Sequence, residues 1–447
     1  MARLIVRPAK EALRGSVPVP SDRSITHRAL ILAALTNGPS ELHGFAYGSD
    51  NLNTLRAMTA LGVRSEDDTR GNLRIRGVGL AGLSQPQEPI DCGHSETELR
   101  LLSGLLAAQP FPSRLTGAPR LQRRDASAVI DPLRKRGARI EARREGERLY
   151  APIDFAGVKP GTRLGPLQHA LSGISDHTKG ALLLSGLFAS GPTVLHEALV
   201  ARDHTERLLD ALGVRIETVG SVVRLHPPAD PLSLRGFVFE LPGDISAASF
   251  LLVAAQLVPD SVVSTRRTGL NPTRSAILDI IRLFGGRTGI TPSGDSMGEP
   301  FGEVSSRGSV LRATPVTGEL AQRAVDEIPI TCALAARARG VTEIADVSWL
   351  RADEPDRLHA LAELLKAFGV SVEERPDGLI IEGRPDRPLR AANVSSGGDH
   401  RVAMTAAVLG LVADGQTIIE SADCIAVSFP RFVGTLRALG ADLEVQS

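Results

Sequence analysis

The sequence predicts an α/β protein of two domains, each built from three copies of one structural unit. The chain has 447 residues, more than a single hydrophobic core usually serves. One pattern of apolar helices, strands and glycine-ended helices also recurs six times. With 42% hydrophobic and 23% charged residues, the composition is that of an ordinary globular protein, which excludes the disordered and fibrous classes.

Each copy of the pattern begins with Gly, Ser or Asp and continues into a helix rich in Ala and Leu. A β-branched strand, a second helix with one charged face and a further strand follow. The first helices are apolar nearly all round, so we expect them to be buried, whereas the second helices should lie outside. The first helices are expected within residues 21–35, 93–108, 172–189, 242–257, 325–338 and 397–413.

The second helix of each copy ends next to a glycine, which we expect to cap the helix with a positive φ. The six endings read TALGVR, RKRGARIE, DALGVRIE, RLFGGR, KAFGVSVE and RALGADLE. The VRIE and ARIE segments alternate between apolar and polar residues, which is typical of strands at the edge of a sheet.

The buried helices are expected to run in parallel within each domain, so that their N-termini meet on one surface. A helix N-terminus exposes free N–H groups and a partial positive charge, and it therefore attracts anions. Capping alone explains one polar residue per helix, but it does not explain the basic residues that gather at these starts. These are Arg23, His27, Arg28, Arg100, His177, Lys179, His400 and Arg401.

The charge balance and the termini exclude several other classes of function. Lys+Arg and Asp+Glu both total 51, and there are no basic arms, so we expect neither nucleic acid nor a membrane as partner. The first residues lack the apolar core of a signal peptide, and we expect a cytoplasmic protein. Cys92, Cys332 and Cys424 lie far apart and form no zinc-binding spacing, so no metal site is predicted.

Nine segments, taken in order, resemble the 5-enolpyruvylshikimate-3-phosphate (EPSP) synthase family, also called 3-phosphoshikimate 1-carboxyvinyltransferases. They are VPSDRSITHRALILAAL, DCGHSETELRLLSGLLA, ARDHTERLLDALG, GDISAASFLL, GLNPTR, DEIPITCALAA, DEPDR, GGDHRVAM and SFPRF. The resemblance covers nearly the whole chain.

The resemblance implies the enolpyruvyl transferase fold, an inside-out α/β barrel with three βαβαββ units per domain. Residues 21–241 would form the first domain and residues 1–20 with 242–447 the second, with the active site in a cleft that closes around substrate. The family reaction joins phosphoenolpyruvate to the 5-hydroxyl of shikimate 3-phosphate and releases phosphate. It implies small-molecule substrates, no cofactor and, in our expectation, a monomer.

The resemblance also assigns roles to individual residues. Arg28, with Ser24 beside it, would clasp the shikimate carboxylate, because a guanidinium donates two parallel hydrogen bonds to such a group. Asp326 would be the catalytic base, and Glu354 its acid–base partner. The residues expected to hold phosphoenolpyruvate are Arg124, Arg357, His400 and Arg401, and Ser175 would bind phosphate. For Asp244 and Ser246 we expect helix capping.

The chain departs from the family pattern at several of these positions. Arg23 replaces a lysine, and a guanidinium does not substitute for a compact ammonium in a tight site. The remaining departures are His94 for asparagine, Glu96 for glycine, Asp176 and His177 in a Ser-(Ser/Ala)-Gln stretch, Ala201 for serine, Asp353 for lysine, and Asp125 for proline. A carboxylate at Glu96 would repel a bound anion 4 Å away by about 4 kcal/mol at an effective dielectric near 20.

Three hypotheses follow. The first is a diverged paralogue that performs an elimination on shikimate or its 3-phosphate without phosphoenolpyruvate. Its base would be Glu96, Asp353, Glu354 or Asp326, with His94 or His177 assisting the leaving group, and Arg23 and His177 would also bind substrate. The second is the ordinary transfer reaction in an atypical, glyphosate-insensitive site. The third is a non-catalytic ligand-binding protein.

Overall fold

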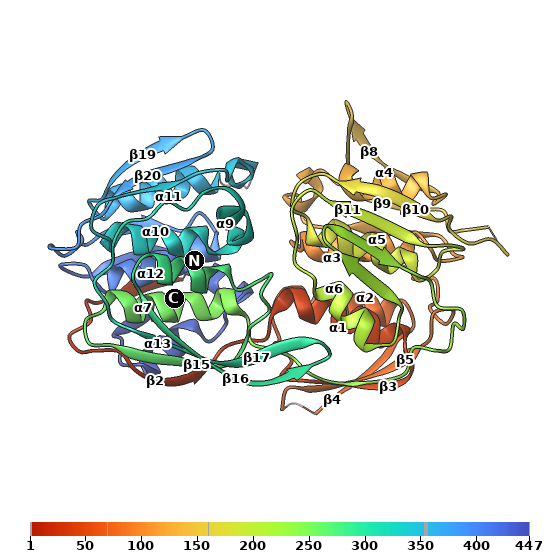
Figure 1. Cartoon of the computed structure of the whole chain (residues 1–447), viewed down its shortest axis with the longest axis horizontal. Helices are drawn as coiled ribbons and strands as arrows, with labels where there is room; N and C mark the ends of the chain where they lie inside the picture. The colour runs from red at the N-terminus through yellow and green to blue at the C-terminus, as the bar shows by residue number, and fades with distance from the viewer. Residues whose placement is uncertain (1, 69, 160, 353–355, 447) are drawn as a thin grey trace. The chain divides into compact units, whose positions relative to one another are not determined.

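The computed structural model describes residues 2–68, 70–159, 161–352 and 356–446. The chain separates into two compact units, which Figure 1 shows in ribbon form. Unit 1 contains Met1–Pro20, Gly243–Gly294 and Pro300–Ser447, and unit 2 contains Ser21–Pro242 and Asp295–Glu299. The short segment Asp295–Glu299 lies at the tip of a hairpin and groups with unit 2.

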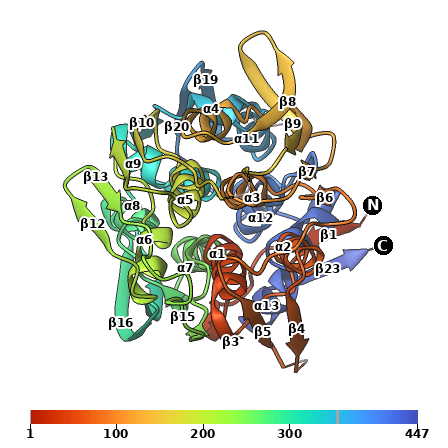
Figure 2. The same ribbon diagram turned by 90° about the vertical axis from the view of Figure 1, so that its right-hand side faces the viewer.

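The six apolar segments form the buried helices of the α/β fold that the sequence predicts. They are α1 (Arg23–Leu35), α3 (Glu96–Leu106) and α5 (Asp176–Gly186) in unit 2, and α7 (Ile245–Leu257), α10 (Ile328–Arg337) and α12 (His400–Gly410) in unit 1. Figure 2 shows α1, α3 and α5 close to end on, so these three helices run side by side. Every residue of α7 is buried, as its predominantly apolar sequence predicts.

Outer helices follow the buried ones in the same order along the chain. They are α2 (Ser49–Ala60), α4 (Ser127–Lys135), α6 (His204–Ala211), α8 (Ala276–Leu283), α11 (Arg357–Ala367) and α13 (Phe432–Ala438), with a short α9 (Gly318–Arg323). The glycines that end the six outer helices all adopt a positive φ, from 75° at Gly369 to 103° at Gly440. The predicted C-caps are therefore confirmed.

The described strands form six sheets, three in each unit. Unit 2 contains β3 (Asn37–His43), β4 (Arg64–Asp67), β5 (Asn72–Val78), β6 (Ile90–Asp91), β7 (Ser113–Thr116), β8 (Ile140–Glu145), β9 (Arg148–Phe155), β10 (Leu167–Leu171), β11 (Thr193–Glu197), β12 (Ile216–Val219), β13 (Val222–Leu225) and β14 (Val238–Glu240). Unit 1 contains β1 (Arg3–Val6), β2 (Arg14–Pro18), β15 (Val262–Gly269), β16 (Arg287–Ser296), β17 (Glu299–Arg307), β18 (Val341–Ile344), β19 (Ser371–Arg375), β20 (Gly378–Glu382), β21 (Asn393–Ser395), β22 (Thr417–Glu420) and β23 (Leu443–Gln446).

Two sheets of unit 2 share one topology. In the sheet β10-β11-β13-β12, the first pair is parallel and the other two pairs are antiparallel, and β6-β7-β9-β8 repeats this arrangement. Strands β8 and β12, which begin at the isoleucines of the ARIE and VRIE patterns, lie at sheet edges as expected. The sheet β21-β22-β1-β23 is completed by the first strand of the chain, which lies between two of the last.

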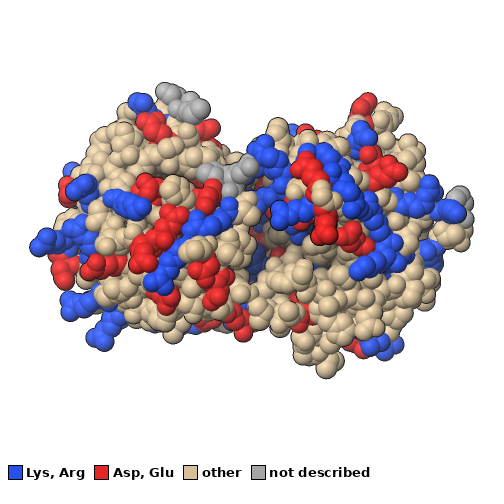
Figure 3. All heavy atoms as spheres, turned by 90° about the horizontal axis from the view of Figure 1, so that it is seen from above, with Lys and Arg blue, Asp and Glu red and all other residues tan. Residues whose placement is uncertain are grey.

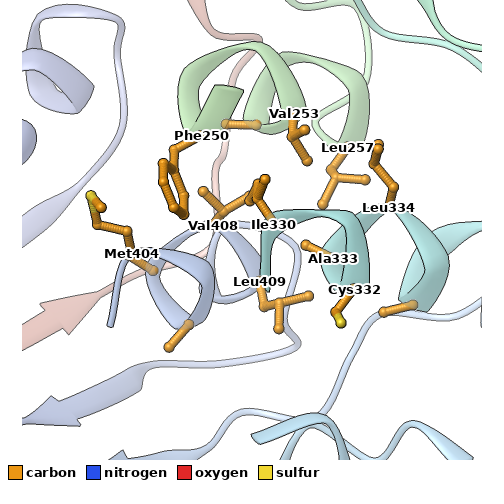
Figure 4. Packing of buried hydrophobic residues seen from close by; sticks show 14 of the residues in the cluster. Phe250, Val253, Leu257, Ile330, Cys332, Ala333, Leu334, Met404, Val408 and Leu409 are labelled. Carbon is orange, nitrogen blue, oxygen red and sulfur yellow. The ribbon is translucent and has the colours of Figure 1, made fainter. Parts of the chain in front are cut away.

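The buried helices pack closely because many of their side chains are small. In unit 1, Phe250 and Val253 of α7 lie against Ile330 of α10 and Val408 of α12 (Figure 4). In unit 2, a Cβ atom placed on Gly104 of α3 would lie 2.0 Å from the carbonyl oxygen of Ala181 on α5, so only glycine fits there. Within the described residues, no helix combines the length and apolarity that a membrane span requires.

Candidate active site

The N-termini of the three buried helices of unit 2 meet. The caps Asp22, Ser95 and Ser175 each accept a hydrogen bond from the first turn of α1, α3 and α5, respectively. Thr97 of α3 lies 3.0 Å from His177 Nε2 of α5, and Arg100 of α3 donates to Thr178 of α5 at 2.9 Å. The convergence expected within a domain is therefore present in unit 2.

Arg28 of α1 is fully buried, and each of its five N–H donors has an acceptor within the protein. Its Nε donates to Thr205 Oγ1 at 2.7 Å, and Nη1 donates to the Ser24 hydroxyl at 2.7 Å and to the Ser24 carbonyl at 2.9 Å. Its Nη2 donates to Asp176 Oδ2 at 3.0 Å and to the Asp176 carbonyl at 3.2 Å. The residue expected to clasp a substrate carboxylate is thus paired with a carboxylate of the chain itself.

Asp176 and His177 stand on the first turn of α5. Burial alone would raise the pKa of Asp176, but His177, Arg28 and Arg202 hold this pKa well below its usual value, so the carboxylate is ionised. Burial lowers the pKa of His177, an effect that Asp176 opposes in part, and the imidazole is therefore neutral near pH 7. His177 can accept or donate a hydrogen bond but brings no permanent positive charge to the site.

Glu96 is paired rather than isolated. Its carboxylate lies 2.5 Å from Arg100 Nη2 and 4.0 Å from Arg124 Nε. Burial would raise the pKa of Glu96, but Arg100, His177 and Arg124 hold this pKa below its usual value. The negative charge expected at Glu96 is therefore compensated by arginines of the chain. Glu96 lowers the net positive charge of a two-arginine cluster that includes Arg124.

Two of the basic residues expected on the anion-binding surface are inside the protein. Lys179 is 1% exposed and pairs with Glu206 at 2.6 Å and Glu197 at 3.0 Å. His27 is bonded to Thr54 Oγ1 at 2.6 Å, and burial lowers the pKa of its imidazole to about 3. His27 Nε2 also lies 3.4 Å from the hydroxyl of Ser95, the cap of α3. Both side chains are therefore bonded to groups of the protein itself.

The remaining predicted residues of unit 2 lie around these helix starts. Arg23 donates to Asp50 Oδ2 of α2 at 3.1 Å. Ser24 is half-buried against Arg28, whereas His94, in the loop before α3, is exposed. Ser175 caps α5 and is 3.4 Å from Arg100 Nη1, which places its hydroxyl beside the arginine cluster.

Unit 1 brings a second set of predicted residues together. Asp326 lies in the 3₁₀ turn η2 (Val325–Glu327) before α10, and its Oδ1 accepts from Arg401 Nη2 of α12 at 2.6 Å. Its Oδ2 lies 3.7 Å from Arg274 Nη2. This guanidinium also donates to Glu327 at 2.7 Å, so α7, α10 and α12 meet at a charged cluster.

Arg357 is anchored by the cap of α12. Its Nε donates to Asp399 Oδ2 at 2.7 Å, while Asp399 Oδ1 accepts from the Arg401 N–H at 2.8 Å. Burial would raise the pKa of Asp399, but Arg357, His400 and Arg401 hold this pKa well below its usual value. Asp353 and Glu354 lie outside the described residues. The described part of the chain has no cluster of three or more His, Cys, Asp or Glu residues suited to a metal ion.

Several residues of both clusters were not predicted. Asp244 caps α7 as expected, but it also lies 3.3 Å from Arg274, which the sequence did not mark. Arg274 is the arginine of the motif GLNPTR, and this motif is the sequence feature from which Arg274 could have been predicted as a site residue. Asp176 was recognised only as a departure, and nothing in its local sequence indicates Arg28 as its partner.

Comparison with known proteins agrees with these features. A profile of the EPSP synthase (3-phosphoshikimate 1-carboxyvinyltransferase) family matches residues 8–436. The chain is 42% identical over 434 residues to the 3-phosphoshikimate 1-carboxyvinyltransferase of Desulforamulus reducens, covering 97% of this chain and 98% of that one. It is also 42% identical over 436 residues to the enzyme of Geobacter sp. strain M21, covering 98% and 99%. The structure of EPSP synthase from Acinetobacter baumannii superimposes with a TM-score of 0.89, at 33% identity and full coverage of both chains. The chain therefore belongs to the EPSP synthase family.

Proposed function

We propose that the protein transfers the enolpyruvyl group of phosphoenolpyruvate to the 5-hydroxyl of shikimate 3-phosphate and releases phosphate. The observation that carries this proposal is the Asp326–Arg401–Arg274 cluster, which joins the expected base to two arginines. The relatives named as 3-phosphoshikimate 1-carboxyvinyltransferases over nearly their whole length support it.

The elimination without phosphoenolpyruvate loses its main support. It rested on the extra carboxylates expected in the site, and one of these, Glu96, is paired with Arg100 and Arg124. None of the relatives described above is named as a lyase. The transfer reaction, which was the second hypothesis, fits the family better.

In this proposal each charged group of the site has a separate role in the reaction. Asp326, which lies between its arginine partners Arg401 and Arg274, accepts the proton of the 5-hydroxyl as this oxygen attacks C2 of phosphoenolpyruvate. Glu354 donates a proton to the methylene carbon, which becomes a methyl group in the tetrahedral intermediate. The intermediate then loses phosphate together with one methyl proton, which the Glu354 carboxylate takes back, and the enol ether forms. Arg124, Arg357, His400 and Arg401 offset the charge on the phosphate and the carboxylate.

We further propose that Glu96 makes the site less sensitive to glyphosate. Its side chain stands at the first position of α3, where the family carries a glycine, and it holds Arg100 and Arg124. A phosphonate ligand must therefore compete with a carboxylate that already pairs with these cations.

The test is incubation of the purified protein with shikimate 3-phosphate, with and without phosphoenolpyruvate, followed by mass spectrometry and phosphate assay. We expect an enolpyruvyl ether and one phosphate per turnover only when both substrates are present. Asp326→Asn should lower kcat at least about a hundredfold, since general base catalysis contributes that much. A new ring product formed without phosphoenolpyruvate would overturn the proposal in favour of elimination, and tight binding without turnover would favour a non-catalytic protein.

A further inference from the structure

Glu327 follows the expected base Asp326 directly in the sequence, but its side chain turns into the protein. The Glu327 side chain has no solvent-exposed surface, whereas 21% of the Asp326 side chain is exposed. One oxygen of Glu327 accepts from Arg274 Nη1 at 2.7 Å and from the Ser246 hydroxyl. Because a charge is costly to bury unless it is paired and hydrogen-bonded, Glu327 and Arg274 belong together as a pair.

Arg274 is held in a defined position by unit 1. Its Nη2 donates to the Ser246 hydroxyl and lies 3.3 Å from Asp244 Oδ1, and both of these groups are at the start of α7. Its backbone N–H donates to the carbonyl of Asn271 at 2.9 Å, which closes the turn of the GLNPTR motif. Only 6% of the Arg274 side chain is exposed. The guanidinium is therefore oriented by the protein and not by solvent.

This position leaves Arg274 just outside hydrogen-bond distance of the expected base. Its Nη2 lies 3.7 Å from Asp326 Oδ2, whereas an N–H···O bond spans about 2.7–3.2 Å. The other oxygen, Asp326 Oδ1, accepts from Arg401 Nη2 at 2.6 Å. A hydrogen bond to the ionised form of a carboxylate lowers its pKa. A second such bond, from Arg274 to Oδ2, would therefore make Asp326 a weaker base.

We propose that Glu327 is a positioning residue, which holds Arg274 at ion-pair distance from Asp326 and so prevents a second hydrogen bond that would weaken the base. This inference rests on the proposed function, because it takes Asp326 as the base of the transfer reaction. Charged groups reach Asp326 from several elements: Arg401 from α12, Arg274 from the GLNPTR turn and, through Arg274, Glu327 and Asp244.

The experiment measures the titration of Asp326 by carbon-13 NMR of protein labelled at the aspartate carboxyl carbons, with Asp326→Asn identifying the signal. We expect Glu327→Gln to lower the midpoint by at least about half a pH unit, because a neutral amide holds Arg274 less firmly. Arg274→Lys keeps the charge that pairs with Glu327 but removes the nitrogen next to Asp326, so it should raise the midpoint. The control Glu363→Gln, which removes a surface carboxylate paired with Lys366, should leave the midpoint unchanged.

Glu327→Asp separates positioning from charge and keeps the proposal testable if Glu327→Gln does not fold. It retains the negative charge but withdraws the carboxylate from Arg274 by one methylene group, so we again expect a lower midpoint. In turnover, the acidic limb of kcat/KM for shikimate 3-phosphate should move with the NMR midpoint. Titration of the substrates is common to all variants and cancels in this comparison.

A purely structural role of Glu327 would lower the melting temperature without moving the titration of Asp326. An unchanged midpoint in Glu327→Asp, or a lower midpoint in Arg274→Lys, would therefore overturn the proposal. Turnover of the wild type with phosphoenolpyruvate judges the proposed function separately, since the NMR titration requires no substrate.

Discussion

Glu98 is the carboxyl group whose protonation the fold changes most clearly. It is fully buried on the first turn of α3, and neither of its oxygens makes a well-formed hydrogen bond within the described residues. Burial, and then the charge of Asp50, raises the pKa of Glu98 from 4.5 to about 9, with Thr54 opposing the shift. Glu98 is therefore a neutral acid at pH 7, unlike its neighbour Glu96.

Glu98→Gln should stabilise the protein at alkaline pH. The unfolded chain releases the proton of Glu98 near pH 4.5, whereas the folded protein retains it up to about pH 9. Folded wild-type protein therefore loses stability as the pH rises through this window. Glutamine does not ionise, so we expect the melting temperature of the variant to exceed that of wild type by several degrees at pH 8. An equal difference at pH 5 and pH 8 would contradict this assignment, and the surface variant Glu217→Gln is the control.

Glu96→Gln should increase affinity for phosphoenolpyruvate. The change removes the negative charge that pairs with Arg100 and Arg124, and a gain of about 1 kcal/mol in a partly screened site corresponds to a roughly fivefold lower KM. The effect should shrink between 50 mM and 500 mM KCl, and inhibition by glyphosate should become stronger. Steady-state kinetics measure the KM for phosphoenolpyruvate and the inhibition by glyphosate, with Glu217→Gln as the control variant. An unchanged KM of Glu96→Gln at low salt would show that the charge of Glu96 does not weaken anion binding by these arginines.

The sequence could indicate single residues of the site but not their pairing. Asp326, Arg357 and Arg401 were predicted, and the structure places Asp326 against Arg401 and anchors Arg357 on Asp399. The bond between Arg28 and Asp176 joins residues 148 positions apart. Its formation depends on how α1 and α5 pack, which no local pattern specifies.

At the scale of helices and strands, more of the structure could be predicted from the sequence than at the scale of single residues. The apolar runs and terminal glycines mark both helices of every copy, because a buried helix requires apolar residues and a positive φ favours glycine. The sequence of the hairpin tip Asp295–Glu299 does not indicate that it belongs to unit 2. Its placement there depends on long-range hydrogen bonds, such as the one between Glu299 Oε1 and His204 Nδ1 at 2.7 Å.

Two glycine variants test how closely the helices pack. Gly104→Ala should destabilise the protein by at least about 2 kcal/mol, because the new methyl group overlaps the backbone of α5 and neither helix can yield easily. Gly434→Ala in α13 should stabilise it by about 0.5–1 kcal/mol, since nothing lies within 4 Å and alanine favours the helix. Urea unfolding measures both, and equal effects of the two variants would contradict the packing.

At the scale of the whole molecule, unit 1 is built from both ends of the chain. Strand β1 pairs with β23 in register, with Arg3 opposite Gln446, and also pairs with β22. The residues of unit 2 form an insertion between Pro20 and Gly243, with Asp295–Glu299 added later. Figure 3 shows acidic and basic side chains interspersed on the face in view, consistent with the balanced total of 51 and 51.

A circular permutant should retain the fold. A linker of about six residues can join the paired ends of β1 and β23, and new termini between Gly146 and Glu147 fall at an exposed turn between β8 and β9. We expect a melting temperature within a few degrees of wild type. A permutant opened within α7, where every residue is buried, should not fold. Circular dichroism and thermal melting compare the two, and equal behaviour would contradict the pairing of the chain ends.

The pairing of β1 with β22 and β23 also sets the order of events on the ribosome. The apolar strand Arg3–Val6 is synthesised long before its partners at Thr417–Glu420 and Leu443–Gln446. Residues 21–242 emerge in between and can fold while the chain is still growing. The apolar strand therefore remains without its partner strands until they have been synthesised, which leaves it open to non-native contacts on the growing chain.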